Sequence, residues 1–203
     1  MRWPIVVTAA SPLGHIAVAV VGDVVTGVSF GHPSSSAAIQ SATRRSGEMP
    51  SEPEGQLSLD AGQRLAADVL DRLGRYADGE PVDFADVRVS VDRLSTFQRR
   101  VVRACRAVAR GQRSTYGQLA AAAGSPGAAR AVGQVMASNG TPIIVPCHRI
   151  VAAGGRLGGF SAPRGLTMKR RLLAMECASG PRRPKIQAPK SSVIARSVVG
   201  VER

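Results

Sequence analysis

The residues of this chain most able to do chemistry are Pro146-Cys147-His148-Arg149, which follow the apolar run 143–145. A cysteine thiol is a weak nucleophile until it becomes a thiolate, and nearby cationic or hydrogen-bonding groups favour that form. Cys147 has a histidine and an arginine within two positions of it along the chain. We therefore expect Cys147 to be a reactive thiol.

The position of His148 directly after Cys147 limits how the two side chains can cooperate. Adjacent side chains of a strand point to opposite faces, so a direct hydrogen bond between them is disfavoured. Cysteine hydrolases pair the two residue types directly and usually take the histidine from a distant part of the sequence. We therefore expect His148 to act on Cys147 through a water molecule, and a hydrolase is the weaker interpretation.

The chain has 203 residues and three cysteines, Cys105, Cys147 and Cys177. They are too few and too widely spaced for a disulfide framework, which suits a reducing compartment, so we expect a cytoplasmic protein. None belongs to a Cys-x-x-Cys pair, so we expect no metal site and no cofactor. No signal-peptide pattern or apolar run of about 20 residues is present, so we expect no membrane association.

The net positive charge of the chain comes entirely from its second half. Residues 1–90 contain 7 Lys/Arg against 11 Asp/Glu, a net charge of −4. Residues 91–203 contain 20 Lys/Arg against 3 Asp/Glu, a net charge of +17. Because Cys147 lies in this basic half, the distribution favours a polyanionic partner there, most plausibly nucleic acid. A high-GC genome that favours Arg would also add positive charge, but it does not account for the acidic first half.

Three strand-like segments open the chain, at residues 3–7, 16–21 and 24–30. Turn residues separate them at Ser11-Pro12-Leu13-Gly14 and at Gly22-Asp23, so we expect a β-meander. Residues 31–57 are rich in Ser, Pro, Glu and Gly and predict a loop or partly disordered insertion.

A helix is predicted over residues 61–77, with Asp60 as its N-cap. Its apolar stripe consists of Leu65, Val69, Leu73 and Tyr76. Residues 84–91 predict a last strand or an extended linker into a second domain.

The sequence of the second half predicts a series of helices. Ser95 and Gln98 fit a capping box at the start of the first helix, and Gly111 is a natural stop for it. One face of this helix carries apolar residues, namely Phe97, Val101, Cys105 and Val108. We therefore expect Cys105 to be a core residue.

Two short helices follow, over Thr115–Ala123 and Pro126–Ala137. Thr115 and Gln118 fit a second capping box, and Pro126 suits the first turn of the next helix. Two short helices joined by a tight glycine-containing turn are typical of a helix-turn-helix, although an ordinary helical pair packed by alanines has the same pattern.

A closing helix is predicted over Leu166–Cys177, after a glycine-rich loop at residues 154–159. It contains Glu176, the only acidic residue between Asp92 and Glu202. Residues 179–203 carry prolines and basic residues without a hydrophobic period, so we expect a disordered basic tail.

Six segments of the second half together resemble the O6-alkylguanine-DNA alkyltransferases, also called methylated-DNA–protein-cysteine methyltransferases. They are Thr115-Tyr116-Gly117, residues 128–133, Asn139 with Pro142, residues 143–151, residues 158–161 and residues 169–176. A Pro-Cys-His-Arg tetrapeptide alone would be a weak signal, but the six segments in this order are specific. The match is close over residues 95–177 and holds only in outline before them.

The resemblance implies an α/β N-terminal domain over residues 1–91, with a small ribonuclease-H-like sheet plus a helix. It implies a mainly α domain of winged helix-turn-helix type over residues 92–178, which holds the DNA-binding and catalytic residues, and the basic tail over 179–203. The implied function is DNA repair in a single turnover. An O6-alkylguanine, or an O4-alkylthymine, is flipped out of duplex DNA and its alkyl group passes irreversibly to Cys147.

The resemblance also assigns chemical roles to five residues. Cys147 is the alkyl acceptor, His148 its base through a water molecule, and Glu176 the group that orients and polarises His148. Tyr116 lies by the flipped base and protonates the departing ring. Asn139 braces the turn that leads to Cys147.

Contacts with DNA and with the flipped base follow from the same resemblance. Arg130 enters the base stack and fills the gap left by the base, although a phosphate contact is the commoner role of such an arginine. The other residues expected at the DNA are Thr115, Tyr116, Ala128, Ala129 and Gly133. The residues expected to line the base pocket are Met136, Ile150, Phe160 and Ser161.

The expected partner is double-stranded DNA that contains alkylated guanine. We expect the protein to bind it as a monomer, and to lie in the nucleoid if the source is prokaryotic.

Two other interpretations involve DNA binding without alkyl transfer. A non-catalytic protein that binds alkylated DNA would lack the cysteine, which is present at position 147. A transcriptional regulator would use the helix-turn-helix alone and would leave the residues around Cys147 without a purpose.

Overall fold

The computed structural model describes residues 4–47 and 59–178. An antiparallel sheet of order β1-β2-β3 forms the N-terminal part, from β1 (Ile5–Ala9), β2 (His15–Val21) and β3 (Val24–His32). The turn before β2 is closed by a 2.9 Å hydrogen bond from the Gly14 amide to the Ser11 carbonyl. Gly14 there takes a φ of 98°, which favours glycine. The predicted meander is confirmed, apart from residue 3, which lies outside the described residues.

A helix, α1 (Ser35–Ser46), occupies much of the segment predicted as a loop, so that prediction is wrong for these residues. The Ser34 hydroxyl caps the helix by accepting from the Ala37 amide. Ala38 and Ala42 then pack against Ala17 and Ala19 of β2. Ser34, one of the serines that favoured a loop, is the N-cap of this helix, and Ala38 and Ala42 form its buried stripe without any large apolar side chain. Residues 48–58 of the predicted loop lie outside the described residues.

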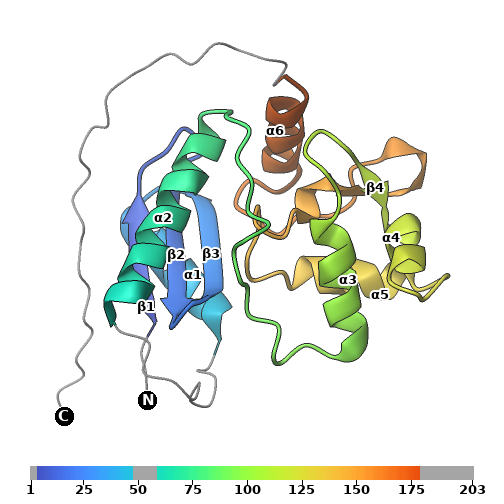
Figure 1. The fold of residues 1–203 in the computed structure, drawn as a ribbon. Coiled ribbons are helices and arrows are strands. Elements are labelled where there is room, and N and C mark those ends of the chain that lie inside the picture. Colours follow the sequence, from blue (N-terminus) through green and yellow to red (C-terminus); the bar gives the residue numbers. More distant parts are fainter. Residues whose placement is uncertain (1–3, 48–58, 179–203) are drawn as a thin grey trace.

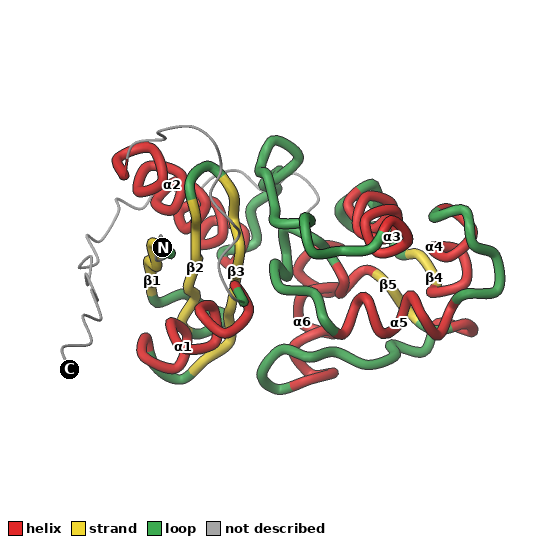
Figure 2. The backbone as a smooth tube through the Cα atoms, turned by 90° about the horizontal axis from the view of Figure 1, so that it is seen from below, coloured by secondary structure: helices red, strands yellow, loops and turns green. Residues whose placement is uncertain are grey.

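The opposite face of the sheet is covered by α2 (Leu59–Ala77), as Figures 1 and 2 show. The predicted stripe is confirmed, because Val69, Leu73 and Tyr76 are buried and Leu65 packs beside them. The helix begins at Leu59, so Asp60 lies in its first turn and is not the N-cap. An acidic side chain there still interacts favourably with the helix dipole.

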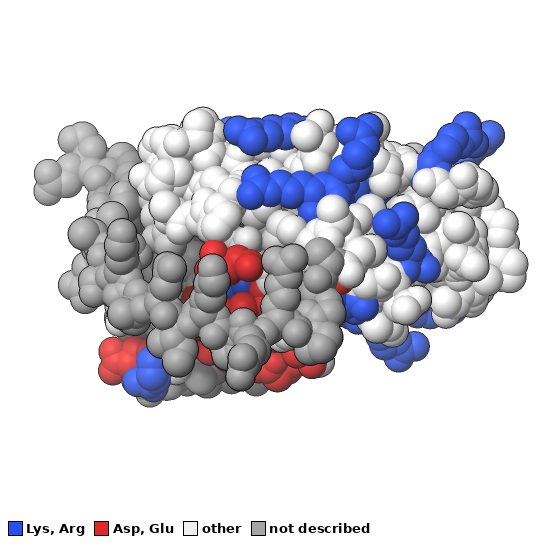
Figure 3. All heavy atoms as spheres, turned by 90° about the horizontal axis from the view of Figure 1, so that it is seen from above, with Lys and Arg blue, Asp and Glu red and all other residues white. Residues whose placement is uncertain are grey.

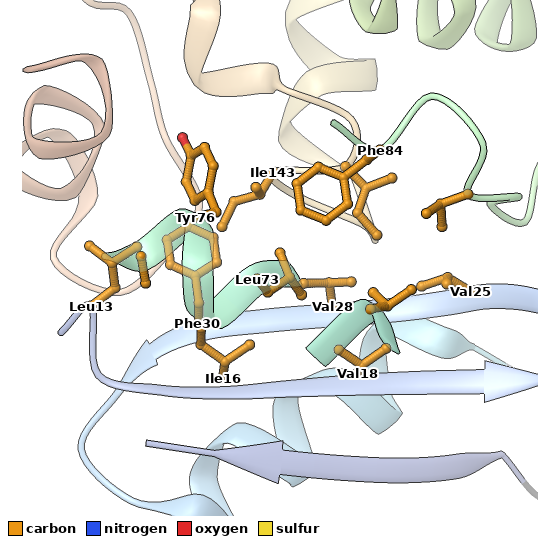
Figure 4. Close-up of a cluster of buried hydrophobic side chains, with 14 of the residues drawn as sticks. Leu13, Ile16, Val18, Val25, Val28, Phe30, Leu73, Tyr76, Phe84 and Ile143 are labelled. Carbon is orange, nitrogen blue, oxygen red and sulfur yellow. The ribbon is translucent and has the colours of Figure 1, made fainter. Parts of the chain in front are cut away.

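The core under α2 is shared with later segments of the chain. Figure 4 shows Leu73 and Phe30 in this cluster beside Phe84 and Ile143, which come from beyond α2. The segment after α2 is an extended linker with a single bridge from Val89 to Val25 of β3. The predicted domain limits stay a prediction.

The second part is mainly helical. Its elements are α3 (Thr96–Arg106), β4 (Ser114–Thr115), α4 (Tyr116–Ala122), α5 (Ala129–Ala137), the 3-10 turn η1 (Cys147–Arg149), β5 (Ile150–Val151), the 3-10 turn η2 (Ala153–Gly155) and α6 (Gly165–Ala178). The two short strands pair in parallel, and α6 lies between the two halves of the molecule (Figures 1 and 2). Both predicted capping boxes are confirmed, with Ser95 and Gln98 at α3 and Thr115 and Gln118 at α4.

Three local predictions for this part are wrong. The first helix ends at Arg106, and Gly111 lies in a turn beyond it with a φ of 76°. Helix α5 begins at Ala129, so Pro126 precedes it. Cys147 begins a 3-10 turn, in which the Pro146 carbonyl accepts from the Arg149 amide. The strand follows Cys147 rather than containing it.

The close contact between α1 and β3 depends on Gly27. A Cβ atom at this position would overlap the backbone carbonyl oxygen of Ala42, which cannot swing away as a side chain could. We expect Gly27→Ala to lower the free energy of unfolding by about 1–3 kcal/mol because the helix must move off the sheet. Urea denaturation followed by circular dichroism measures this change.

Gly74→Ala is the matched control. This glycine lies inside α2, and an added Cβ would meet no atom within 4 Å. We expect it to raise the free energy of unfolding by about 0.5–1 kcal/mol, through helix propensity alone. Equal effects of the two substitutions would contradict the packing assigned to Gly27.

Candidate active site

Cys147 lies where the cores of the two halves meet. Ile143 and Ile144 pack in the core under α2, whereas Val145 and Cys147 pack in the core of the helical part. Ile143 takes a φ of 75°, which a β-branched residue rarely adopts. The burial of its side chain in the first core holds it there, so the chain can cross from one core to the other directly before Cys147.

Asn139 holds the turn that leads to Cys147. Its side-chain Nδ2 donates to the Val145 carbonyl at 2.8 Å, and its Oδ1 accepts from the Thr141 amide at 3.1 Å. The residue is buried, so these bonds do not compete with water. This arrangement fixes the backbone on both sides of the apolar run.

His148 and Glu176 form a buried pair, which we call the relay. The imidazole Nε2 lies 2.9 Å from Glu176 Oε1, and both side chains are fully buried. Burial lowers the pKa of His148 more than the Glu176 carboxylate raises it, so the ring is neutral at physiological pH. A neutral ring next to a carboxylate carries its proton on Nε2, which leaves Nδ1 as the basic nitrogen. This buried Nδ1 has no hydrogen-bond partner among the described protein groups.

Arg149 forms an ion pair with the Glu176 carboxylate of the relay. Its Nη2 lies 2.9 Å from Glu176 Oε1 and its Nε lies 3.0 Å from Oε2, a two-pronged ion pair. Burial alone would raise the pKa of Glu176, but the hydrogen bonds from His148 and Arg149 outweigh it and hold that pKa well below its usual range. The carboxylate therefore stays ionised at any physiological pH.

The thiol of Cys147 is protonated in the resting protein. Its side chain is buried, and this burial raises its pKa. A hydrogen bond from Asn139 and the positive charges of Lys169 and Arg45 act in the opposite direction and favour the thiolate. The thiol therefore needs a base to remove its proton when it reacts. His148 of the relay directly follows Cys147 in the chain.

Three residues that take part in this arrangement were not predicted from the sequence. The Lys169 ammonium is buried and donates to the Ile150 carbonyl at 2.6 Å, where burial lowers its pKa to about 8. Arg45 of α1 donates to the Asn139 carbonyl at 2.9 Å. The Tyr76 hydroxyl of α2 donates to Glu176 Oε1 at 2.8 Å.

The sequence held a signal for only one of the three. Lys169 falls within the buried stripe of α6, between Met168 and Leu172, so its helical position indicated an inward side chain. Arg45 stood in a segment predicted as a loop. Tyr76 matched the apolar stripe of α2, and nothing local indicates where its hydroxyl points.

The residues predicted to line the base pocket occupy different environments. Met136 and Ile150 are buried with Cys147 in the helical core. Phe160 is half-buried, and the Lys169 ammonium lies 6.0 Å from its ring centre. Ser161 is exposed. The structure thus places the first three of these residues around Cys147 and Lys169, with Ser161 at the outer edge.

Tyr116 opens α4 and is half-buried, with the Lys169 ammonium 5.9 Å from its ring centre. A Cβ atom at Gly158 would lie 2.9 Å from the Tyr116 ring, so glycine at 158 lets the loop pack on the tyrosine. Burial raises the pKa of Tyr116, so its hydroxyl keeps its proton. Tyr116, Phe160 and Cys147 therefore share one neighbour, Lys169.

The residues predicted at the DNA lie along α4 and α5. Arg130 is exposed, while Val132 and Met136 on the inner face of α5 are buried. Ala128 and Ala129 at the start of α5 are half-buried. A Cβ atom at Gly133 would meet no atom within 4 Å. The Thr115 hydroxyl accepts from the Gln118 amide as the N-cap of α4.

Charge is unevenly spread over the face shown in Figure 3. Lys and Arg side chains, drawn blue, are scattered over the centre of this face and over the half that holds the helical part, and the red acidic side chains lie toward the other half. Within residues 4–47 and 59–178, no cluster of His, Cys, Asp and Glu could hold a metal ion. None of the helices in this part of the chain is long and apolar enough to cross a membrane.

Cys147 is buried beside a histidine–carboxylate pair, and two short helices lie in the same basic half of the chain. This combination indicates a protein that uses a cysteine thiol in a reaction on nucleic acid. Comparison with known proteins narrows this class. Residues 96–178 match the family described as 6-O-methylguanine DNA methyltransferase, DNA binding domain. The chain belongs to the methylated-DNA–protein-cysteine methyltransferase family, so the resemblance seen in the sequence is confirmed.

Relatives and solved structures give the extent of the similarity. The methylated-DNA–protein-cysteine methyltransferase of Mycolicibacterium paratuberculosis is 42% identical over 118 residues, which cover 58% of this chain and 69% of the relative. That of Methanopyrus kandleri is 47% identical over 111 residues, covering 55% and 80%. The crystal structure of Mycobacterium tuberculosis OGT in complex with DNA aligns with a TM-score of 0.62 at 33% identity, over 86% of this chain and 93% of that one. The predicted fold class is also confirmed.

The state of Cys147 can be tested without DNA by alkylation with iodoacetamide. At neutral pH we expect exposed Cys177 to react first and Cys147 to react at least about tenfold more slowly, because Cys147 is buried and its pKa is raised. The rate at Cys147 should keep rising with pH beyond the range of an ordinary thiol. Peptide mass spectrometry reads each site separately.

Cys105 serves as an internal control, because it is fully buried and burial raises its pKa. It should stay unlabelled until the protein unfolds. Labelling of Cys147 as fast as Cys177 at neutral pH would mean that the resting protein holds a thiolate, contrary to this account.

Proposed function

We propose that this protein repairs DNA by moving the alkyl group of O6-alkylguanine onto Cys147. The observation that carries this proposal is the buried Cys147 beside the His148–Glu176 relay, in a chain of the methylated-DNA–protein-cysteine methyltransferase family. The Cys147 sulfur attacks the alkyl carbon, a new sulfur–carbon bond forms, and the bond from that carbon to the guanine oxygen breaks. The product is an alkyl thioether that the protein does not reverse, so each molecule acts once.

The relay removes the proton from the thiol during this attack. Nδ1 of His148 is the nitrogen with a free lone pair, and a water molecule between it and the sulfur carries the proton. The imidazolium that forms lies 2.9 Å from the ionised Glu176 carboxylate, which stabilises the positive charge. Because burial keeps the resting ring neutral, His148 can accept a proton at physiological pH.

Tyr116 supplies the proton for the leaving purine. When the bond to the alkyl carbon breaks, its electron pair moves into the guanine ring, which then needs a proton. The raised pKa of Tyr116 keeps its hydroxyl a donor at physiological pH. Its place beside Lys169, which also favours the Cys147 thiolate, puts it on the same side of the site as the sulfur.

The DNA contacts use the small residues at the start of α5. The target carbon of a stacked base is out of reach of a buried sulfur, so the nucleotide must be flipped out of the duplex. Ala128, Ala129 and Gly133 let the α5 backbone approach the minor groove closely, and exposed Arg130 fills the space of the flipped base. We take the bound protein to be a monomer.

The flipped base lies against four residues, Met136, Ile150, Phe160 and Ser161. A pocket with an aromatic ring on one side and aliphatic residues on the other can stack a flipped base with little discrimination between guanine and thymine. We therefore include O4-alkylthymine as a second substrate. Ser161, which is exposed, contacts the base only at the pocket entrance.

The test is a single-turnover reaction with a duplex that carries one labelled O6-methylguanine. We expect intact mass spectrometry to find one methyl group per protein molecule, on Cys147, with no transfer in Cys147→Ser. Cys177→Ser, which alters an exposed cysteine, should transfer as the wild type does. A parallel duplex with O4-methylthymine tests the second substrate.

Two results would count against the proposal. Tight binding to the lesion without any gain in mass would favour a protein that marks alkylated DNA. A methyl group found on Cys177 in place of Cys147 would remove the role assigned to the relay.

A further inference from the structure

The structure brings Tyr76 of the N-terminal part into the relay of the C-terminal part. Its hydroxyl donates to Glu176 Oε1 at 2.8 Å and lies 3.3 Å from His148 Nε2. The side chain is 1% exposed, and 100 and 72 residues separate it in sequence from these two partners. Figure 4 shows its hydroxyl pointing away from the strands, out of the core that buries its ring. This tyrosine therefore joins the packing of α2 to the hydrogen bonds of the site.

The Tyr76 hydroxyl can serve only as a protonated donor to Glu176. Burial and the nearby carboxylate raise its pKa well above the ordinary value, although Arg149 and Arg110 act in the opposite direction. Arg110 lies over the ring, 5.2 Å from its centre. Because the hydroxyl hydrogen is directed at Glu176, the lone pairs of the phenol oxygen are the part that can face His148 Nε2.

The carboxylate of Glu176 is held on all sides. Oε1 accepts from Tyr76, His148 and Arg149, and Oε2 accepts from Arg149 and from the Gly111 amide. His148 Nε2 thus faces two oxygens, one of Glu176 and one of Tyr76, and neither of them has a hydrogen to offer it. The only arrangement that satisfies both contacts has the proton on Nε2.

We propose that Tyr76 is a positioning residue for alkyl transfer, which fixes His148 in the tautomer with a free Nδ1. The inference rests on the proposed function of Cys147 and His148. It assigns the N-terminal part of the chain a place in the chemistry, because its helix α2 supplies one of the two acceptors that face Nε2.

The first experiment needs no substitution. Nitrogen NMR of wild-type protein with labelled histidine should show a protonated Nε2 and an unprotonated Nδ1 for His148 at neutral pH. In Tyr76→Phe, which keeps the ring and removes only the hydroxyl, the two signals should shift toward a mixture of tautomers. A wild-type His148 with its proton on Nδ1 would overturn the proposal, whether or not the protein transfers alkyl groups.

The second experiment measures the rate of transfer from an O6-methylguanine duplex at saturating protein. We expect Tyr76→Phe to transfer about tenfold more slowly, part of the 100-fold or more that a general base contributes. Its affinity for the unmodified duplex should be unchanged. A rate within twofold of the wild type, with unchanged nitrogen signals, would reduce Tyr76 to a packing residue.

Leu73→Ala is the matched control for packing. Leu73 is fully buried on the same helix, one turn before Tyr76, and belongs to the same core. We expect this variant to melt at a lower temperature than Tyr76→Phe, yet to transfer within twofold of the wild-type rate well below that temperature. An equal loss of rate in both variants would also overturn the proposal, since it would come from the packing of α2 in general.

Discussion

The buried carboxylate of Glu176 is the constraint on which the rest of the site depends. An ionised group without exposure to water is tolerated only when its oxygens are fully hydrogen-bonded. Its donors are four residues from three places in the chain, namely Tyr76 of α2, the Gly111 amide after α3, and His148 and Arg149 of the turn η1. The carboxylate can therefore be buried only when α2, α6 and η1 meet, and their meeting holds His148 Nε2 against Glu176.

The apolar packing brings these segments together. The run before Cys147 contributes Ile143 to the core under α2 and Val145 to the core of the helical part. Leu172 of α6 lies in the first core as well, one turn before Glu176. The same segments that join the two cores thus also carry the residues of the relay. The N-terminal sheet is in this sense a support for the site.

The sequence predicted the local part of this arrangement well. Capping boxes, the meander and the stripe of α2 depend on neighbours within a few residues, and the structure has all of them. The sequence prediction failed at several helix ends, over α1, and where a residue's role is set by distant parts of the chain. Arg45 and Tyr76 reach Asn139 and Glu176 across 94 and 100 residues, and no local period encodes such contacts. Lys169 lies on the buried face of α6, but its role depends on the Ile150 carbonyl that its ammonium meets, and the helical period does not show that partner.

The central claim is that an ionised Glu176 makes His148 the base for Cys147. The most direct measurement is the single-turnover rate of methyl transfer by Glu176→Gln, which keeps the size of the side chain and removes its charge. The account predicts a rate at least about 100-fold below the wild type, with affinity for the unmodified duplex retained, because the imidazolium loses its counter-charge. A rate within threefold of the wild type would contradict it and would mean that Cys147 reacts without the relay.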